Sequence, residues 1–125
     1  MPKPDMMVIT DREKVTKSPR KGVAIAAAGG TTALTFTMEG RGVLTRYILE
    51  LPIMASAPTI TLSLVDENSV TIFTGAAHAS SAGALANFSV PIDVEINGKY
   101  TVTLTPSGSS GTVATIYLTF FVRPQ

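Results

Sequence analysis

Two stretches of alternating apolar and polar residues, one on each side of Asn97-Gly98, constrain this sequence more than any other feature. Residues 88–96 place an apolar side chain at almost every second position, and residues 100–105 do so again. Alternation with a period of two is typical of a β-strand that buries one face. Asn-Gly between two such runs is typical of a two-residue hairpin turn, because both residues adopt positive φ at little energetic cost. The sequence therefore predicts an antiparallel β fold with a hairpin turn at Asn97-Gly98.

Other segments share this strand character. Residues 59–66, TITLSLVD, alternate most regularly. Residues 43–51 are apolar enough for a strand that is buried on much of both faces, and Pro52 bounds them too tightly for a long helix. Besides the two runs above, strands are expected at 33–38, 43–51, 59–66, 70–74 and 112–122, while residues 23–28 form either a first strand or an apolar linker.

The segments between these strands have the composition of turns and loops. Residues 39–42, EGRG, are expected to form a turn, residues 66–69 a hairpin loop and residues 106–111 a flexible loop. Residues 75–86, GAAHASSAGALA, form either a short helix or an ordered loop. Pro91 lies inside an alternating run, and since proline has no N–H to donate, its strand is expected at a sheet edge or at a bulge.

The number and spacing of these segments indicate a fold class. About seven or eight short strands with regularly spaced turns are typical of a single antiparallel β-sandwich, jelly-roll-like or Ig-like. The sequence has no Cys and no Trp, the residues that mark true Ig domains, which favours the jelly-roll-like form. We therefore predict an all-β protein with an extended N-terminal arm at 1–22 and a β-sandwich domain at 23–125.

The predicted arm differs from the rest of the chain in charge. It holds six basic and three acidic residues, whereas residues 23–125 hold four basic and six acidic ones. Its three prolines favour extended backbone. Such a segment is either a partly disordered tail or an arm that docks on a neighbouring subunit, and a run of four apolar residues favours docking. The candidate interface residues are Met6, Met7, Val8, Ile9, Arg12, Lys14, Lys17, Arg20 and Lys21.

Composition narrows the classes of partner. Charged residues make up only 15% of the chain and the net charge is +1, which suits a subunit that covers its surface with copies of itself or with a larger body. Acidic residues interrupt the basic ones of the arm and no aromatic residue is interleaved, so nucleic-acid binding is not expected. The sequence contains no apolar run long enough to predict a transmembrane helix and no secretory signal pattern.

No carboxylate or metal-ligand pattern indicates a catalytic or cofactor site. Without Cys and with a single His, the chain cannot build a thiolate or multi-histidine metal cluster. Residues 66–68, Asp-Glu-Asn, lack the ligand spacing of a calcium loop. Asp93 and Glu95 lie about 7 Å apart along one strand, but they fit better as solvated residues that keep an edge from aggregating.

His78 is the remaining candidate for chemistry. It is either a general base or a solvent-facing or interface histidine. Ser80 and Ser81 are its neighbours in sequence only, and no nucleophile-elbow motif is present. We favour the non-catalytic interpretation, and we expect no enzymatic activity, no cofactor and no metal.

The order of segments from residue 43 to residue 122 resembles that of small structural proteins of tailed bacteriophages. The pattern begins with residues 58–66, PTITLSLVD, a short polar turn and residues 70–73, VTIF. A small-residue segment, Pro91-Ile92, residues 98–106, GKYTVTLTP, a Ser/Gly loop and a final apolar strand follow. The resemblance implies a β-sandwich that coats or decorates virions in many copies, and it implies no catalytic or binding residue.

The role that this resemblance implies is that of a capsid decoration, or cement, protein. Its expected partners are the major capsid protein or other virion subunits, its expected oligomer is a homotrimer, and its expected location is the virion, after assembly in the host cytoplasm. A neck, tail or baseplate component is an alternative. So is a receptor- or carbohydrate-binding sandwich, which would need Tyr47, Tyr100 and Tyr117 to form an exposed cluster.

Overall fold

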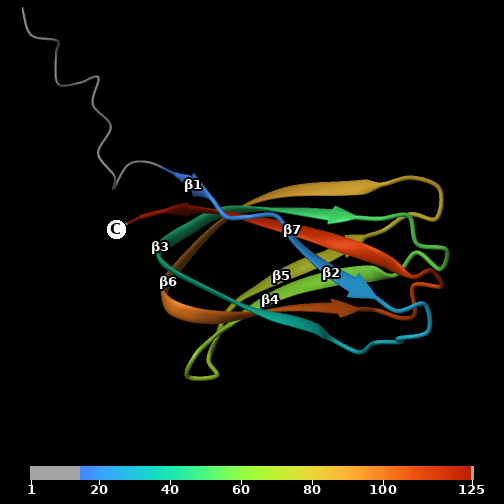
Figure 1. The fold of residues 1–125 in the computed structure, drawn as a ribbon, viewed down its shortest axis with the longest axis horizontal. Coiled ribbons are helices and arrows are strands. Elements are labelled where there is room, and N and C mark those ends of the chain that lie inside the picture. Colours follow the sequence, from blue (N-terminus) through green and yellow to red (C-terminus); the bar gives the residue numbers. More distant parts are fainter. Residues whose placement is uncertain (1–14, 125) are drawn as a thin grey trace, which may run out of the picture.

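The protein is described here by a computed structural model that covers residues 15–124 and contains seven β-strands and no helix in that range (Figure 1). The strands are β1 (Thr16–Lys17), β2 (Lys21–Ile25), β3 (Leu34–Leu51), β4 (Thr59–Asp66), β5 (Thr71–Ala79), β6 (Ala86–Pro106) and β7 (Ala114–Arg123). Every pairing is antiparallel, and the strand order is β1-β7-β3-β6-β4-β5, with β2 also paired to β7. The predicted all-β antiparallel sandwich is confirmed.

The sandwich is one sheet folded onto itself rather than two separate sheets. The first half of β3 pairs with the second half of β6, which also pairs with β4, and β4 pairs with β5. The second half of β3 pairs with the first half of β6 and with β7, which carries β1 and β2. Figure 1 shows the two layers facing each other, with β3 and β6 passing between them at one end, called here the bend end.

Glycines occupy the bend. Gly40 and Gly98 are paired across β3 and β6, and Gly42 lies two residues further along β3. Gly42 has φ 133° and Gly98 has φ 120°, a region that side chains with a Cβ rarely adopt. A Cβ at Gly42 would lie 2.3 Å from the carbonyl oxygen of Arg123. Glycine therefore allows both the backbone angle and the close approach of β7 at this corner.

The hairpin predicted at Asn97-Gly98 is wrong, and so is the turn predicted at 39–42. Asn97 and Gly98 lie inside the continuous strand β6, opposite Arg41 and Gly40 in β3. Because two long strands bend together, each continues its hydrogen-bonded ladder through the glycines, and neither chain reverses. The conformational freedom of Gly98 is used for a change of layer, which local sequence signals do not distinguish from a turn.

The other segments agree with the sequence in most places. Strands at 43–51 and 59–66 and the loops at 66–69 and 106–111 are confirmed, whereas 75–79 continue β5 instead of forming a helix or loop. The first half of β6 is an edge in the described part of the chain, because it pairs with β3 alone. A register shift between Leu44 and Arg46 lies opposite Pro91, so the predicted edge and bulge are both present.

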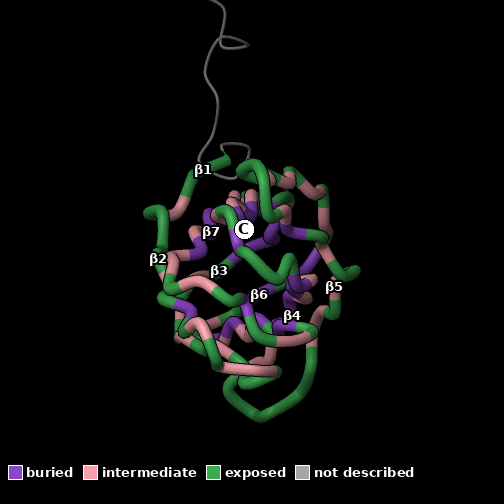
Figure 2. Tube along the Cα trace, turned by 90° about the vertical axis from the view of Figure 1, so that its right-hand side faces the viewer, coloured by how far each residue is buried: buried purple, intermediate pink, exposed green. Residues whose placement is uncertain are grey.

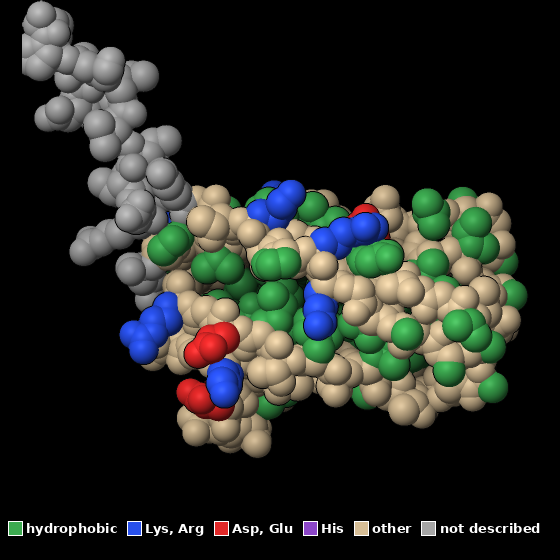
Figure 3. Space-filling model, viewed as in Figure 1, with side chains coloured by type: hydrophobic (Ala, Val, Ile, Leu, Met, Phe, Trp, Pro, Cys, Tyr) green, Lys and Arg blue, Asp and Glu red, His purple; other side chains and the backbone are tan. Residues whose placement is uncertain are grey.

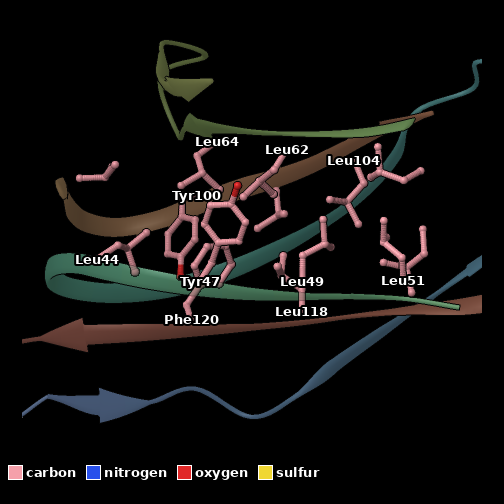
Figure 4. Close-up of a cluster of buried hydrophobic side chains, with 14 of the residues drawn as sticks. Leu44, Tyr47, Leu49, Leu51, Leu62, Leu64, Tyr100, Leu104, Leu118 and Phe120 are labelled. Carbon is pink, nitrogen blue, oxygen red and sulfur yellow. The ribbon is translucent and has the colours of Figure 1, made fainter. Parts of the chain in front are cut away.

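The core lies between the two layers (Figure 2). Its largest fully buried side chains are Tyr47, Phe120, Leu44, Leu49, Leu51, Met54, Ile60, Leu62, Leu64, Leu104, Ile116 and Leu118. Figure 4 shows Tyr47, Tyr100 and Phe120 meeting in the middle, where Tyr47 and Tyr100 pack against the ring of Phe120. Inward side chains come from alternate positions of each strand, as the period of two predicts.

Candidate functional site

The last part of the predicted arm is the first structured segment of the chain. Thr16 and Lys17 pair with Val122 and Phe121 of β7, and β2 pairs with residues 114–118 of the same strand. Between these pairings, the N–H of Ser18 donates to the carbonyl of Phe120 (2.8 Å), and the N–H of Phe120 donates to Ser18 Oγ (2.9 Å). Residues 15–22 therefore lie along β7, and the boundary predicted after residue 22 falls inside β2.

Arg20 links this segment to the outer face of the neighbouring strand. Its guanidinium donates to both carboxylate oxygens of Glu50, at 2.9 Å and 3.2 Å, and its Cζ lies 3.6 Å from the ring centroid of Tyr117. The hydrogen bond to Glu50 is the main cause that raises the pKa of Arg20. A planar guanidinium satisfies a forked ion pair and a stacking contact together, which an ammonium group does not.

The structure places three of the nine candidate interface residues. Lys17 and Lys21 are exposed, and Lys21 Nζ lies 5.7 Å from the ring centroid of Phe36. Arg20 is held by Glu50, so its charge is already compensated. The remaining six, Met6, Met7, Val8, Ile9, Arg12 and Lys14, lie outside the described residues.

A shallow groove accompanies this segment. It has a volume of about 520 Å³ and lies between residues 17–20 and the outer face of β3 and β7, where Ile48, Glu50 and Thr119 line it. A second hollow of about 140 Å³ adjoins it beside Tyr117 and includes Leu85 and Pro52. Both surfaces are open and mixed in polarity, which suits contact with a protein surface better than enclosure of a small ligand.

His78 lies in the seam between the edge strands of the two layers. Its Nε2 is 2.6 Å from the hydroxyl of Tyr47, and its ring centroid is 4.6 Å from that of Phe88 on β6. Partial burial lowers the pKa of His78 and raises the pKa of Tyr47. At neutral pH the imidazole is therefore uncharged, and it shares a hydrogen bond with the Tyr47 hydroxyl in which the imidazole tautomer sets the donor.

This arrangement makes His78 a bridge between layers. The hydroxyl of Ser80 donates to the carbonyl oxygen of Pro58, and the hydroxyl of Ser81 accepts from the N–H of Gly83. Neither of these two serines therefore forms a hydrogen bond with the imidazole that would orient it as a nucleophile. Sequence reasoning missed the partnership with Tyr47, because the two residues lie on strands that are not neighbours in the sheet.

The acidic residues considered as candidate ligands or catalysts lie in a hairpin loop and on an exposed strand face. Asp66 Oδ1 accepts from the N–H groups of Asn68 and Val70, both at 2.9 Å, and so closes the β4–β5 hairpin. Asp93 and Glu95 are exposed on β6. Residues 15–124 contain no group of three His, Cys, Asp or Glu side chains that is arranged for a metal ion. Within this same range there is no helix of the length and hydropathy that a membrane span needs.

The three tyrosines do not form an exposed cluster. Tyr47 and Tyr100 are buried in the core, and burial raises the pKa of Tyr100 to about 12. Tyr117 is half-buried beneath Arg20. The aromatic platform that the carbohydrate-binding alternative needs is therefore not made by these residues.

Comparisons with known proteins bear on the fold. No protein-family model matches the sequence, and no curated protein matches it. A chain in the structure of infectious bursal disease virus, Gx strain, is similar with a TM-score of 0.52 and 9% identity, over 88% of this chain and 33% of that chain. This protein thus spans about a third of the length of that viral chain.

A second solved structure is a carbohydrate-binding module, CBM36, in complex with calcium and xylotriose. It has a TM-score of 0.43 and 12% identity, over 89% of this chain and 92% of that chain. That TM-score is too low to carry an argument about function. At 9% identity, the likeness to the viral chain shows the fold alone, which is a β-sandwich.

Proposed function

We propose that this protein is a non-enzymatic structural component of a virus particle, and specifically a capsid decoration (cement) protein of a tailed bacteriophage. In this role it binds the major capsid protein or other virion subunits in many copies, with a homotrimer as the expected form. Its N-terminal segment attaches it to the shell or to a sister subunit. The virion is its place of action, after assembly in the host cytoplasm.

The observation that carries this proposal is the course of the N-terminal segment. Residues 16–25 add to the edge of the sandwich along β7, and exposed Lys17 and Lys21 lie on that edge. The chain before Thr16 therefore starts from a fixed point beside Val122 near the bend end. A fully extended chain of fourteen residues spans at most about 50 Å, which is the greatest distance at which docking of residues 1–14 could hold the domain from its partner.

Two further features support a structural role. Catalysis needs a nucleophile, base or acid held in reach of a substrate, and His78, Asp66 and Arg20 are each engaged in contacts that hold the fold together. The fold is also similar to part of a chain from a viral structure. Fold likeness leaves the function open, so it adds only consistency.

The direct test is to detect the protein in particles. Phage particles purified from cells that encode this chain are analysed by quantitative mass spectrometry, and the copy number is compared with that of the major capsid protein. A number comparable to the count of capsid subunits supports decoration, whereas a few copies per particle indicate the neck, tail or baseplate. Absence from purified particles would overturn the proposal.

The arm is tested separately by truncation. Because residues 15–22 lie along the sheet, a chain lacking residues 1–14 keeps both N-terminal strands and is the cleaner variant. We expect it to fold normally and to co-sediment less well with particles that lack the protein. The matched control is the full-length chain with Arg12 and Lys14, two basic residues of the deleted segment, changed to Ser, which separates loss of these charges from loss of the arm. Full binding by the truncated chain would contradict docking through the arm.

A further inference from the structure

The end of the sandwich opposite the bend has no charged side chain in any of its four loops. Residues 26–33, 52–58, 80–85 and 107–113 contain no Asp, Glu, Lys or Arg. Figure 1 places these loops together at the right-hand end. In Figure 3, blue and red side chains cover the other end and the middle, while the loop end is hydrophobic or neutral. We call this surface the loop end.

Three of the most exposed large apolar residues of the described chain lie here. Val113 is 77% exposed, Leu85 is 70% exposed and Ile53 is 45% exposed. Leu85 and Pro52 line one hollow together, and Val113 follows Thr112, whose Oγ1 accepts from the N–H of Ala55 at 3.0 Å. Leu85 and Val113 therefore lie next to the 52–55 segment, which itself carries Ile53. Neighbouring exposed apolar side chains on a chain this poor in charge indicate an interaction surface.

Hydrogen bonds hold the four loops in one arrangement. The N–H of Met54 donates to the carbonyl oxygen of Ser81 (3.1 Å), and the N–H of Ser56 donates to the carbonyl oxygen of Ser110 (2.9 Å). The N–H of Gly111 donates to the carbonyl of Ala27 at 2.9 Å. The buried hydroxyl of Ser110 bonds to the carbonyl of Thr112 as well. A surface that is ordered in advance loses little conformational entropy on binding.

The charge distribution identifies the occupant. A nucleic acid or an anionic membrane is recognised by Lys and Arg, which the loop end lacks. Two copies of the loop end, however, meet without bringing like charges of these four loops together. The nearest charged groups are Arg20 and Glu50, which line the hollow beside Leu85, and they already neutralise each other in an ion pair. A twofold contact requires a surface that is complementary to itself, and a threefold contact brings neighbouring parts of the same surface together around one axis; an uncharged apolar surface with small residues allows both. The charged bend end, where the N-terminal segment begins, stays free for another partner.

We propose that the loop end is a self-association surface, through which copies of this chain meet around Leu85, Val113 and Ile53. This rests on the proposed function only for the expectation that the protein acts in several copies. The inference assigns a different contact to each end of the sandwich. The loop end joins copies to each other, and the bend end with the N-terminal arm faces the particle.

The test is sedimentation equilibrium of the purified full-length chain from micromolar to millimolar concentration. We expect a mass of two or three times 13.1 kDa. Leu85→Asp and Val113→Asp should each raise the dissociation constant at least about tenfold, because a buried apolar contact is replaced by a desolvated charge. Val70→Asp is the matched control, since Val70 is 55% exposed on the β4–β5 hairpin at the bend end.

Each variant is first checked for unchanged circular dichroism and unfolding midpoint, and Leu85→Ser serves as a milder change if the aspartates disturb folding. A wild-type chain that stays monomeric at every concentration would overturn the inference, as would a Val70→Asp effect equal to that of Leu85→Asp. The outcomes distinguish the two proposals. A monomer found in particles at high copy number removes this inference and the expected homotrimer but leaves the decoration role standing, while self-association of a protein absent from particles removes only the proposed function.

Discussion

Replacing Gly42 with alanine should destabilise the protein more than any other single-methyl addition at a glycine of the described chain. Two effects combine there. The φ of 133° lies in a region that residues with a Cβ avoid, at a cost of about 1–3 kcal/mol. The added Cβ would also lie 2.3 Å from the carbonyl oxygen of Arg123, and overpacking against backbone costs about 1–3 kcal/mol more. We expect a total loss of about 2–6 kcal/mol in the free energy of unfolding.

Two other glycines separate these effects. Gly30 has φ 60° and no atom within 4 Å of the position that an alanine Cβ would occupy, so Gly30→Ala measures the conformational cost alone, about 1 kcal/mol. Gly83 has neither positive φ nor a neighbour within 4 Å, and Gly83→Ala should change stability by less than about 0.5 kcal/mol. The assay is urea unfolding followed by circular dichroism, with the slope checked for constancy. A loss at Gly42 no larger than that at Gly30 would refute the close packing of β7 against the bend.

Two more predictions concern the core and the seam. Leu62→Ala should lower the free energy of unfolding by about 2–5 kcal/mol, because the side chain is fully buried between the layers; a urea midpoint as high as that of exposed Val70→Ala would contradict the packing. His78 has a pKa lowered from 6.5 in the folded state, so its unfolded form binds the proton more readily below that value. The stability that the neutral imidazole contributes to the folded state is thus fully present above pH 6.5, and it is lost as the pH falls through the pKa of His78 in the folded protein. Wild type should therefore lose stability relative to His78→Gln between neutral pH and about pH 5 in thermal unfolding, and parallel curves for the two proteins would contradict the partial burial of the imidazole.

The strands that the sequence predicted best are those whose pattern is set by burial. Residues 59–66 alternate without interruption, and β4 has these bounds because one face contacts the core while the other faces water. Pro91 was assigned correctly for a similar reason, since a missing N–H restricts a strand wherever it lies. The burial of a side chain in an alternating strand and the missing N–H of a proline are properties of single residues. They can therefore be predicted without knowledge of the tertiary structure.

The errors share a different cause. Asn97-Gly98 and residues 39–42 have turn composition, yet they face each other across β3 and β6. Each segment alone is free to reverse, and only the long ladder on both sides of it keeps the chain extended. Residues 75–79 likewise join β5 because β4 offers a partner strand, although their small residues have no strand preference of their own.

The sequence by itself determined the fold class, the alternation of buried and exposed side chains, and the absence of charge from residues 26–33, 52–58, 80–85 and 107–113, because composition and periodicity depend only on which residue meets water. Tertiary structure decided which loops meet and which residues pair over distance. It joined His78 to Tyr47, stacked Arg20 on Tyr117, and brought four uncharged loops to one end. Those outcomes depend on how one sheet folds over at its glycines, and contacts between distant strands leave no pattern in either strand alone.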